Sequence, residues 1–582
     1  MNKSVKIIVL TISAIIAVCL SILYIPSVQR AIVELVERIK DDDIRDIFWK
    51  QQMFAFATCG ILLICLINYI LWTKRGRNLI ENFCLSIKTE YNFITKNNKY
   101  LLFFVAIYFL GYFTIIRGNY SYISVDDLER QLNGTRAWFG WYRYISEFGS
   151  IIIHTTPRLI DIAPLTQFFA IMFISLASFA TVQVATDEKI TWLSCVAALP
   201  IGLFPYFLAT ISYRYDSPYM ALSVFASALP FVFRKDKIKY IIMSIVGLLA
   251  MCWTYQASNG IYIILTIFCA LKMIKEEAHW QQIGKFILTS ICCYVLTLSF
   301  FSFTFMEQME NIGPGQIDDS IKLSSIINNA TKYIVTTWQG LRGTVLRVIL
   351  TLIIVANAFL APILHQKKKG IFFLASISFY ILSLPLSYGA YLAMAAPSLD
   401  ARAMYGIGFL TAVSSILLSC NLRNFPKPLT SFSKFLIYAT SYCCLAFAFA
   451  FGNAQTEQNK YAEFRERMVI EDLSKTIPDF NDNPEIAIEF ANGVDYAPIV
   501  QNLIKVYPLA SICIDKYAVT ARCNRYIMQS YGYPAKGKSS DCKDLPTLIE
   551  TNFHIIQGKD NHYLVTFKEP QHKTIKTRGF VD

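Results

Sequence analysis

Charge is scarce in this sequence, and acidic side chains are absent from its most apolar stretches. Only 16% of the 582 residues are charged, whereas 54% are hydrophobic. One water-soluble core does not hide that much apolar surface, so an ordinary soluble domain is excluded. The apolar residues instead recur in runs of roughly 20, the length of a bilayer-spanning helix. The composition therefore predicts a mostly α-helical, polytopic membrane protein.

About thirteen runs are predicted to span the membrane and to form a transmembrane domain over residues 1–452. The first run is longer than the hydrophobic region of a signal peptide and lacks a small-residue cleavage site, so it is interpreted as a retained span. The predicted spans lie near residues 7–25, 54–72, 101–116, 164–184, 190–208, 217–233, 240–256, 259–274, 286–306, 344–364, 370–392, 403–421 and 435–452.

None of these spans contains an aspartate or a glutamate. Ion-coupled transporters usually bury ionisable residues near the middle of the membrane, because their coupling chemistry takes place there. The sequence also lacks an internal inverted repeat of the kind found in many transporters. We therefore expect the chemistry of this protein at the membrane surface.

The net charge of +13 is explained by topology rather than by nucleic-acid binding. Basic clusters follow alternate spans, as the positive-inside rule requires if the N-terminus is cytoplasmic. They include Lys74, Arg75 and Arg77, and later Lys367, Lys368 and Lys369. This orientation places the segment after residue 452 on the outer side of the membrane.

Residues 453–582 are predicted to form a small α/β domain on the same side as the outer loops. The segment EIAIEFANG is typical of a strand, APIVQNLIKV of a helix, and HYLVTFKE shows the alternation of a strand. Of 15 cysteines, only Cys513, Cys523 and Cys542 lie in this domain. An oxidising compartment permits one disulfide among them, and the sequence does not choose the pair.

Polar residues gather in the loop after the third span. Asp126 and Asp127 form an adjacent carboxylate pair suited to general-base chemistry. Guanidinium groups bind phosphate bidentately and indole rings stack on sugars, which makes further residues candidates for substrate binding. These are Arg136, Trp138, Trp141 and Arg143. The alternative is structural, with Ser124 and Asp127 in a capping box and the aromatic residues in an interfacial belt.

Two more outer segments carry charge. SYRYDSPY places Arg214, Tyr215 and Asp216 in a short turn, where an Arg214–Asp216 pair or a helix cap at Asp216 is the structural alternative. SLDARAMYG provides Asp400 and Arg402, with Asp400 as a candidate cap. The sequence has no CxxC pair, P-loop or HExxH motif, so no metal site or cofactor is predicted, although a carboxylate pair could hold a divalent ion.

The order of these motifs resembles that of a known family. A DD pair in the first large outer loop, then GTRAWFGWYRY, SYRYDSPYM and LDARAMYG, is similar to the bacterial O-antigen glucosyltransferases of serotype-converting phage islands. The resemblance implies a GT-C-like enzyme of the bacterial inner membrane, with its C-terminal domain in the periplasm. Such an enzyme moves glucose from undecaprenyl-phosphate glucose to O-antigen repeats of lipopolysaccharide on the periplasmic side. It implies Asp126 or Asp127 as general base, and a polyprenyl-phosphate-glucose synthase and a flippase as partners in the same pathway.

These observations lead to a hypothesis of inverting displacement at the sugar C1 atom. Arg214 and Arg402 are the first candidates to balance the leaving phosphate, followed by Arg136 and Arg143. The alternatives are another polyprenyl-phosphate-sugar glycosyltransferase, or a flippase or transporter of lipid-linked sugars. An acyltransferase is disfavoured by the presence of only 6 histidines. The acceptor hydroxyl, the anomeric outcome and the choice between Asp126 and Asp127 stay open.

Overall fold

The computed structural model describes most of the chain. The described residues are 50–118, 125–306, 323–365, 369–477, 480, 486–516, 521–533, 545–559 and 561–569, with scattered residues between 13 and 32. Most of the first predicted span, at residues 7–25, lies outside this set. So do Ser124, which was the predicted partner in a capping box, and Cys542.

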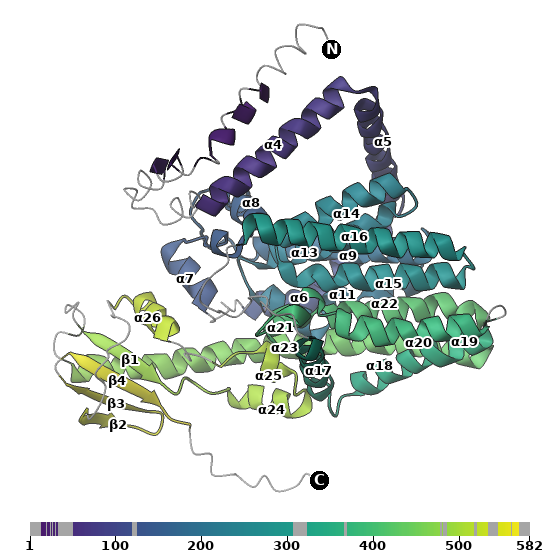
Figure 1. Cartoon of the computed structure of the whole chain (residues 1–582). Helices are drawn as coiled ribbons and strands as arrows, with labels where there is room; N and C mark the ends of the chain where they lie inside the picture. The colour runs from purple at the N-terminus through teal and green to yellow at the C-terminus, as the bar shows by residue number, and fades with distance from the viewer. Residues whose placement is uncertain are drawn as a thin grey trace.

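The described chain is mainly helical, with a small sheet at one end (Figure 1). Eight helical segments in it are long and apolar enough to cross a membrane. They are Asn98–Gly118 (α6), Leu165–Thr186 (α9), Gln256–Lys275 (η3 and α15), Trp280–Phe305 (α16), Val345–Leu364 (α18, η4 and α19), Lys369–Leu386 (α20), Ala401–Asn424 (α21, α22 and η6) and the long Lys427–Thr476 (α23).

The number of candidate spans rises to ten if each of two bent helix pairs is one span. One pair joins α4 (Lys50–Trp72) to α5 (Lys74–Lys96) at 97°, and the other bends by 56°. The second pair consists of α10 (Trp192–Ala198) and α11 (Pro200–Leu203), followed by α12 (Pro205–Ser212). Pro205 removes a backbone donor and forces Phe204 into an extended conformation, which accounts for the second bend. The prediction of a polytopic helical protein is confirmed, and the count of thirteen spans is not.

Two predicted spans correspond to helices that are short for a membrane crossing. Residues 217–233 form α13 (Ser217–Ala228) with η2 (Leu229–Phe233), and α14 covers Lys237–Cys252. The helix is interrupted between α14 and η3 (Gln256–Ser258). The sequence predicted two helices here rather than one. The break positions the backbone of Trp253, whose carbonyl accepts hydrogen bonds from Ile145 and Ser146 of the outer loop.

Helix α23 connects the bundle to the sheet without interruption (Figure 1). Its 50 residues correspond to roughly 75 Å at the rise of an α-helix. The helix packs along α6, and Gly452 allows close approach because a Cβ there would collide with Thr114 and the backbone of Ile115. The predicted domain boundary at residues 452–453 therefore falls inside a continuous helix.

The C-terminal part contains a four-stranded sheet in the order β1-β4-β3-β2. Strand β1 (Ala487–Ala491) is parallel to β4 (His562–Phe567), whereas β3 (His554–Lys559) is antiparallel to β4 and to β2 (Thr547–Glu550). Helix α26 (Ala521–Ser530) and the end of α23 cover this sheet with a second apolar core. The strands predicted at EIAIEFANG and HYLVTFKE and the helix at APIVQNLIKV are confirmed.

The chain between β1 and α26 returns to the membrane part. Helices α24 (Pro498–Val506) and α25 (Ala510–Cys513) contribute Val500 and Cys513 to the main core, and Leu509 just before α25 joins them. The Cys513 thiol is free and buried, with its Sγ 3.7 Å from the carbonyl oxygen of Pro205. Cys513 is therefore not part of a disulfide, and a pair between Cys523 and Cys542 is the pairing that remains from the prediction.

The outer segments that hold the polar residues are short helices. After α6 come α7 (Val125–Asn133), η1 (Phe139–Trp141) and α8 (Tyr144–His154). Helix α17 (Leu323–Gly340) packs against η5 (Gly389–Ala393), and its Tyr333 ring stacks on that of Tyr388, the residue before η5, with 4.4 Å between ring centroids. These elements form the end of the bundle next to the sheet.

Candidate active site

Asp126 and Asp127 lie in the first turn of α7, where the helix macrodipole favours negative charge. Their surroundings differ. The Asp127 side chain is 0% exposed, whereas the side chain of Asp126 is 39% exposed. The helix therefore presents one carboxyl group to the protein interior and the other to the surface.

Asp127 supports the turn that follows α12. Its Oδ2 accepts a hydrogen bond of 2.9 Å from the backbone N–H of Arg214, and its Oδ1 is buried without a hydrogen-bond partner among the described residues. Burial raises the pKa of Asp127 to about 7, although the hydrogen bond from Arg214 opposes the rise. This carboxyl group fixes the position of a backbone and does not face the surface.

Arg130 and Asp216 form a buried ion pair that ties α7 to the start of α13. Trp138 completes the group, since its Nε1 donates to Asp216 Oδ1 at 2.5 Å and its ring lies 4.4 Å from the Arg130 guanidinium. Burial works against ionisation of Asp216, but the charge of Arg130 and the Trp138 hydrogen bond together lower its pKa. Asp216 and Trp138 thus hold elements together in this structure.

The two structural alternatives considered for SYRYDSPY are both wrong. Asp216 occupies the N-cap position of α13 without capping it through its side chain, and it pairs with Arg130 rather than with Arg214. The Arg214 side chain instead lies 3.0 Å from Asp161 Oδ2. Tyr215 is buried and stacks on His154, with 5.8 Å between ring centroids. Tertiary contacts across the loop decide these partners, because local spacing alone favoured the neighbour in sequence.

Arg136 is also engaged inside the protein. Its Nε donates to Glu147 Oε1 at 2.5 Å, its Nη1 donates to the Pro157 carbonyl at 2.5 Å, and Glu147 Oε2 accepts from the Trp138 backbone N–H at 3.1 Å. Both side chains are buried. Sequence analysis did not identify Glu147, although a single acid in the first turn of the apolar helix α8 was a signal that it has a buried partner.

The accessible part of the site joins residues far apart in the sequence. Arg402 Nη1 lies 3.5 Å from Asp126 Oδ2, and its Nε lies 4.0 Å from Asp400 Oδ2. The Arg402 guanidinium also lies 5.0 Å from the centroid of the Tyr213 ring. Asp400 is at the N-cap position of α21 (Ala401–Met404), but its side chain accepts from Ser398 Oγ and makes no cap bond. The predicted cap at Asp400 is therefore wrong.

Arg143 and Trp141 extend this surface. The Arg143 guanidinium lies 4.6 Å from the Tyr255 ring and 5.8 Å from the Trp141 ring, which is 60% exposed. Arg143 thus adds a second guanidinium group, and Trp141 an exposed ring, to the accessible part of the site.

The geometry divides the predicted site residues into two sets. Asp126, Arg402, Asp400, Arg143 and Trp141 lie at or near the surface. The interior set consists of Asp127, Arg136, Trp138, Arg214, Tyr215 and Asp216. Sequence analysis did not identify Asp161 or Glu147, and it did not predict that Arg130 pairs with Asp216. The prediction that no metal is required stays untested.

The fold and this cluster define a class of protein: a polytopic helical membrane protein with a carboxylate and guanidinium groups at one end of its helices, beside a small α/β unit. A family model described as "Glucosyl transferase GtrII" matches residues 116–413, which is more than half of the chain. The protein belongs to the GtrII glucosyl transferase family. This assignment fits the resemblance to serotype-converting glucosyltransferases and supports a glycosyltransferase.

A similar protein comes from Salmonella phage P22 and is described as "Uncharacterized 55.3 kDa protein in gtrB 5'region". It is 30% identical over 183 residues, which cover 31% of this chain and 37% of that protein. No solved structure matches the chain. The family match includes Asp126, Arg143, Arg214 and Arg402, and the C-terminal sheet lies outside it.

Proposed function

We propose that this protein transfers glucose from undecaprenyl-phosphate glucose to a hydroxyl group of lipid-linked O-antigen repeats on the periplasmic side of the bacterial inner membrane. Membership of the GtrII family supports the glucosyl group and the reaction class. The observation that carries the proposal is the approach of Arg402 to Asp126, two groups 276 positions apart that meet at the surface.

In the proposed reaction Asp126 is the general base. It takes the proton of the acceptor hydroxyl while the hydroxyl oxygen forms a bond to C1 of glucose. The bond between C1 and the phosphate oxygen breaks, and its electron pair leaves with the polyprenyl phosphate. Inversion at C1 follows from a single displacement. Asp126 fits this role better than Asp127, because Asp127 has no exposed surface.

Arg402 and Arg143 balance the negative charge of the leaving phosphate. The Arg143 guanidinium lies over the Tyr255 ring and that of Arg402 faces Asp126, whereas Arg214 and Arg136 already hold Asp161 and Glu147. Arginine suits this task because its planar donors bind phosphate oxygens in pairs. Trp141 is exposed next to Arg143 and offers a ring face on which a sugar could stack. No step in this scheme needs a metal ion.

The membrane contributes to the rate. A polyprenyl tail stays in the lipid while its phosphate remains at the surface, so donor and acceptor meet at the height of the site. Because both substrates are confined to the membrane, less entropy is lost when they meet in the site. A polyprenyl-phosphate-glucose synthase and a flippase are the partners that would supply the donor.

The test is a transfer assay in membranes that contain undecaprenyl-phosphate glucose and lipid-linked O-antigen. We expect Asp126→Asn to lower transfer by roughly 10²- to 10⁴-fold, the usual contribution of a general base. Asp400→Asn is the matched control, since Asp400 is an exposed carboxylate that also faces Arg402 and has no base role in this scheme. Full transfer by Asp126→Asn would refute the assignment.

The second candidate function is a flippase for lipid-linked sugars. The polar residues at the membrane surface are compatible with it, but the family match favours a transferase. Movement of an isotopically labelled lipid-linked sugar across vesicles, without formation of a glycoside, would favour the flippase.

A further inference from the structure

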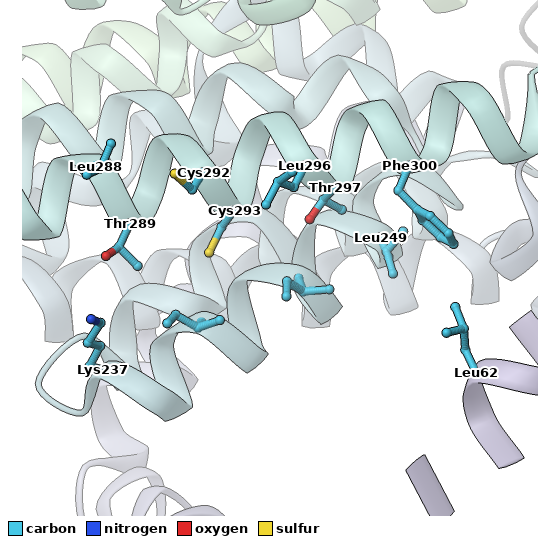
Figure 2. A pocket seen from close by; sticks show the side chains of 12 residues that line it. Leu62, Lys237, Leu249, Leu288, Thr289, Cys292, Cys293, Leu296, Thr297 and Phe300 are labelled. Atoms are coloured by element: carbon cyan, nitrogen blue, oxygen red, sulfur yellow. The ribbon is translucent and has the colours of Figure 1, made fainter. Parts of the chain in front are cut away.

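A groove runs along the outside of the bundle between α14 and α16, with Leu62 of α4 on its far side (Figure 2). Its volume is about 550 Å³, within the range of sites for small molecules. Apart from Lys237, Thr289 and Thr297, its lining consists of aliphatic, aromatic and cysteine side chains. The groove is therefore suited to a hydrocarbon chain.

The groove opens toward the lipid rather than toward the core. Leu288 and Leu296 of α16 are 62% and 69% exposed, and Ile245 of α14 is 41% exposed. Side chains of this kind on a spanning helix lie in contact with the bilayer, since lipid is the solvent at that height. A ligand of this groove thus enters from the membrane.

One end of the groove carries a positive charge. Lys237 is the first residue of α14, and its side chain extends toward Thr289 of α16 (Figure 2). The neighbouring lysines have carboxylate partners, with Lys235 at 2.8 Å from Glu188 and Lys239 at 3.1 Å from Asp236. Within the part of the chain that the structure describes, Lys237 has no ion-pair partner. Its charge is available to a ligand.

The basic helix α5 lies near this end of the groove. The ring of Phe83 in α5 stacks on Phe233, four positions before Lys237, at 6.4 Å between centroids. Ile80, Cys84, Ile87 and Tyr91 form an exposed stripe at helical spacing along α5. Arg77 and Lys88 flank this stripe and are exposed too. A helix of this type lies at a lipid surface and favours anionic headgroups.

We propose that the groove binds one anionic phospholipid of the inner leaflet, with an acyl chain between α14 and α16 and the headgroup phosphate at Lys237. The end marked by Lys237 lies on the side that the positive-inside rule assigns to the cytoplasm, opposite to the site at Asp126. The bound lipid is therefore distinct from the glycosyl donor, whose phosphate lies at the other surface. This inference does not depend on the proposed reaction.

The test uses native mass spectrometry of the purified full-length protein with phosphatidylglycerol or phosphatidylcholine of identical acyl chains. We expect the wild type to retain phosphatidylglycerol about fivefold more than phosphatidylcholine, the effect of roughly one lysine at an anionic headgroup. Lys237→Gln should abolish this preference. Ile245→Trp should fill the groove and reduce retention of both lipids.

Lys427→Gln is the matched control, because Lys427 is also an exposed first residue of a helix on the same side and lies outside the groove. It should keep the wild-type preference. A preference that survives in Lys237→Gln, or one that is lost equally in Lys427→Gln, would overturn the site at Lys237. Unchanged retention by Ile245→Trp would overturn the placement of the chain. Displacement of phosphatidylglycerol by an equal amount of undecaprenyl phosphate would instead assign the groove to the carrier lipid.

Discussion

Asp126 and Asp127 are adjacent in the sequence and have separate tasks in the structure. One carboxylate faces Arg402 at the surface, and the other holds the backbone of Arg214 in the interior. Successive residues of a helix point about 100° apart, so a pair of neighbours at the edge of a packed helix faces two environments. Two adjacent carboxylates in a helix are thus not equivalent candidates for a general base.

The buried Asp127 predicts how stability depends on pH. Its pKa is raised from 3.8 to about 7 in the folded state, so the folded protein holds a proton that the unfolded chain releases. The free energy of unfolding should therefore fall as the pH rises from about 4 to about 7, and then level off. For the wild type this decrease in the free energy of unfolding is on the order of a few kcal/mol. Asp127→Asn should remove most of it, because asparagine does not titrate.

Thermal unfolding of the two proteins at several pH values measures this effect. Between pH 5 and pH 8 the melting temperature of the wild type should fall further than that of Asp127→Asn. Parallel pH curves for the two proteins would show that Asp127 is ionised throughout, as an exposed carboxylate would be.

Arg402 is predicted to act on the charge that develops on the leaving phosphate. Arg402→Gln should lower the rate of glucosyl transfer by roughly 10²- to 10³-fold, as loss of a preorganised electrostatic partner does. Arg402→Lys should restore only part of the rate, because an ammonium group lacks the paired donors of arginine. The exposed Arg342 offers a control, and Arg342→Gln should leave the turnover number unchanged. Full activity of Arg402→Gln would show that Arg402 does not stabilise the leaving phosphate.

At the scale of elements, α7 is held from two sides. Asp127 and Arg130 attach it to the turn before α13, while Leu128 packs against the core that α26 and the sheet form. The helix that bears the exposed carboxylate is thus placed by the membrane part and by the C-terminal part together. The sequence predicted a helix that starts near Asp126, but nothing in it indicated the contact with residues 400 positions later.

Leu128→Ala tests this placement. We expect the substitution to reduce glucosyl transfer severalfold by loosening α7, and to lower stability by about 1–3 kcal/mol, less than for a fully buried leucine. The pH profile of the residual activity should keep its shape, since the base itself is unchanged. Leu132→Ala on the same helix is the control, because Leu132 is 38% exposed and should tolerate truncation. Equal effects of the two substitutions would show that the contact of Leu128 with the C-terminal core has no special role.

At the scale of the whole molecule, α23 fixes the side on which the C-terminal part lies. The helix starts at Lys427 and carries the chain to the sheet, whose core contacts Leu128 in the same outer region as Asp126. The sheet and α7 must therefore lie on the same side of the membrane. The distribution of lysine and arginine predicts that this side is the one opposite the cytoplasm.

Cysteine labelling tests the orientation. In a cysteine-free background, Ser474→Cys at the exposed end of α23 should react with a membrane-impermeant maleimide in intact spheroplasts. Lys88→Cys on α5 should react only after the membrane is permeabilised. Labelling of both positions from the same side would contradict the topology on which the proposed function depends.

Composition and the spacing of apolar runs determined that this is a helical membrane protein with a small C-terminal sheet. A spanning helix needs an unbroken apolar run and a strand needs alternating residues, and both patterns belong to consecutive residues of the chain. The motifs also determined which loops carry the polar residues. Only the tertiary structure decided which of those residues reach the surface and which hold each other inside. Asp216 meets Arg130, Arg214 meets Asp161 and Arg402 meets Asp126 through packing between distant helices, and local spacing contains no information about such partners.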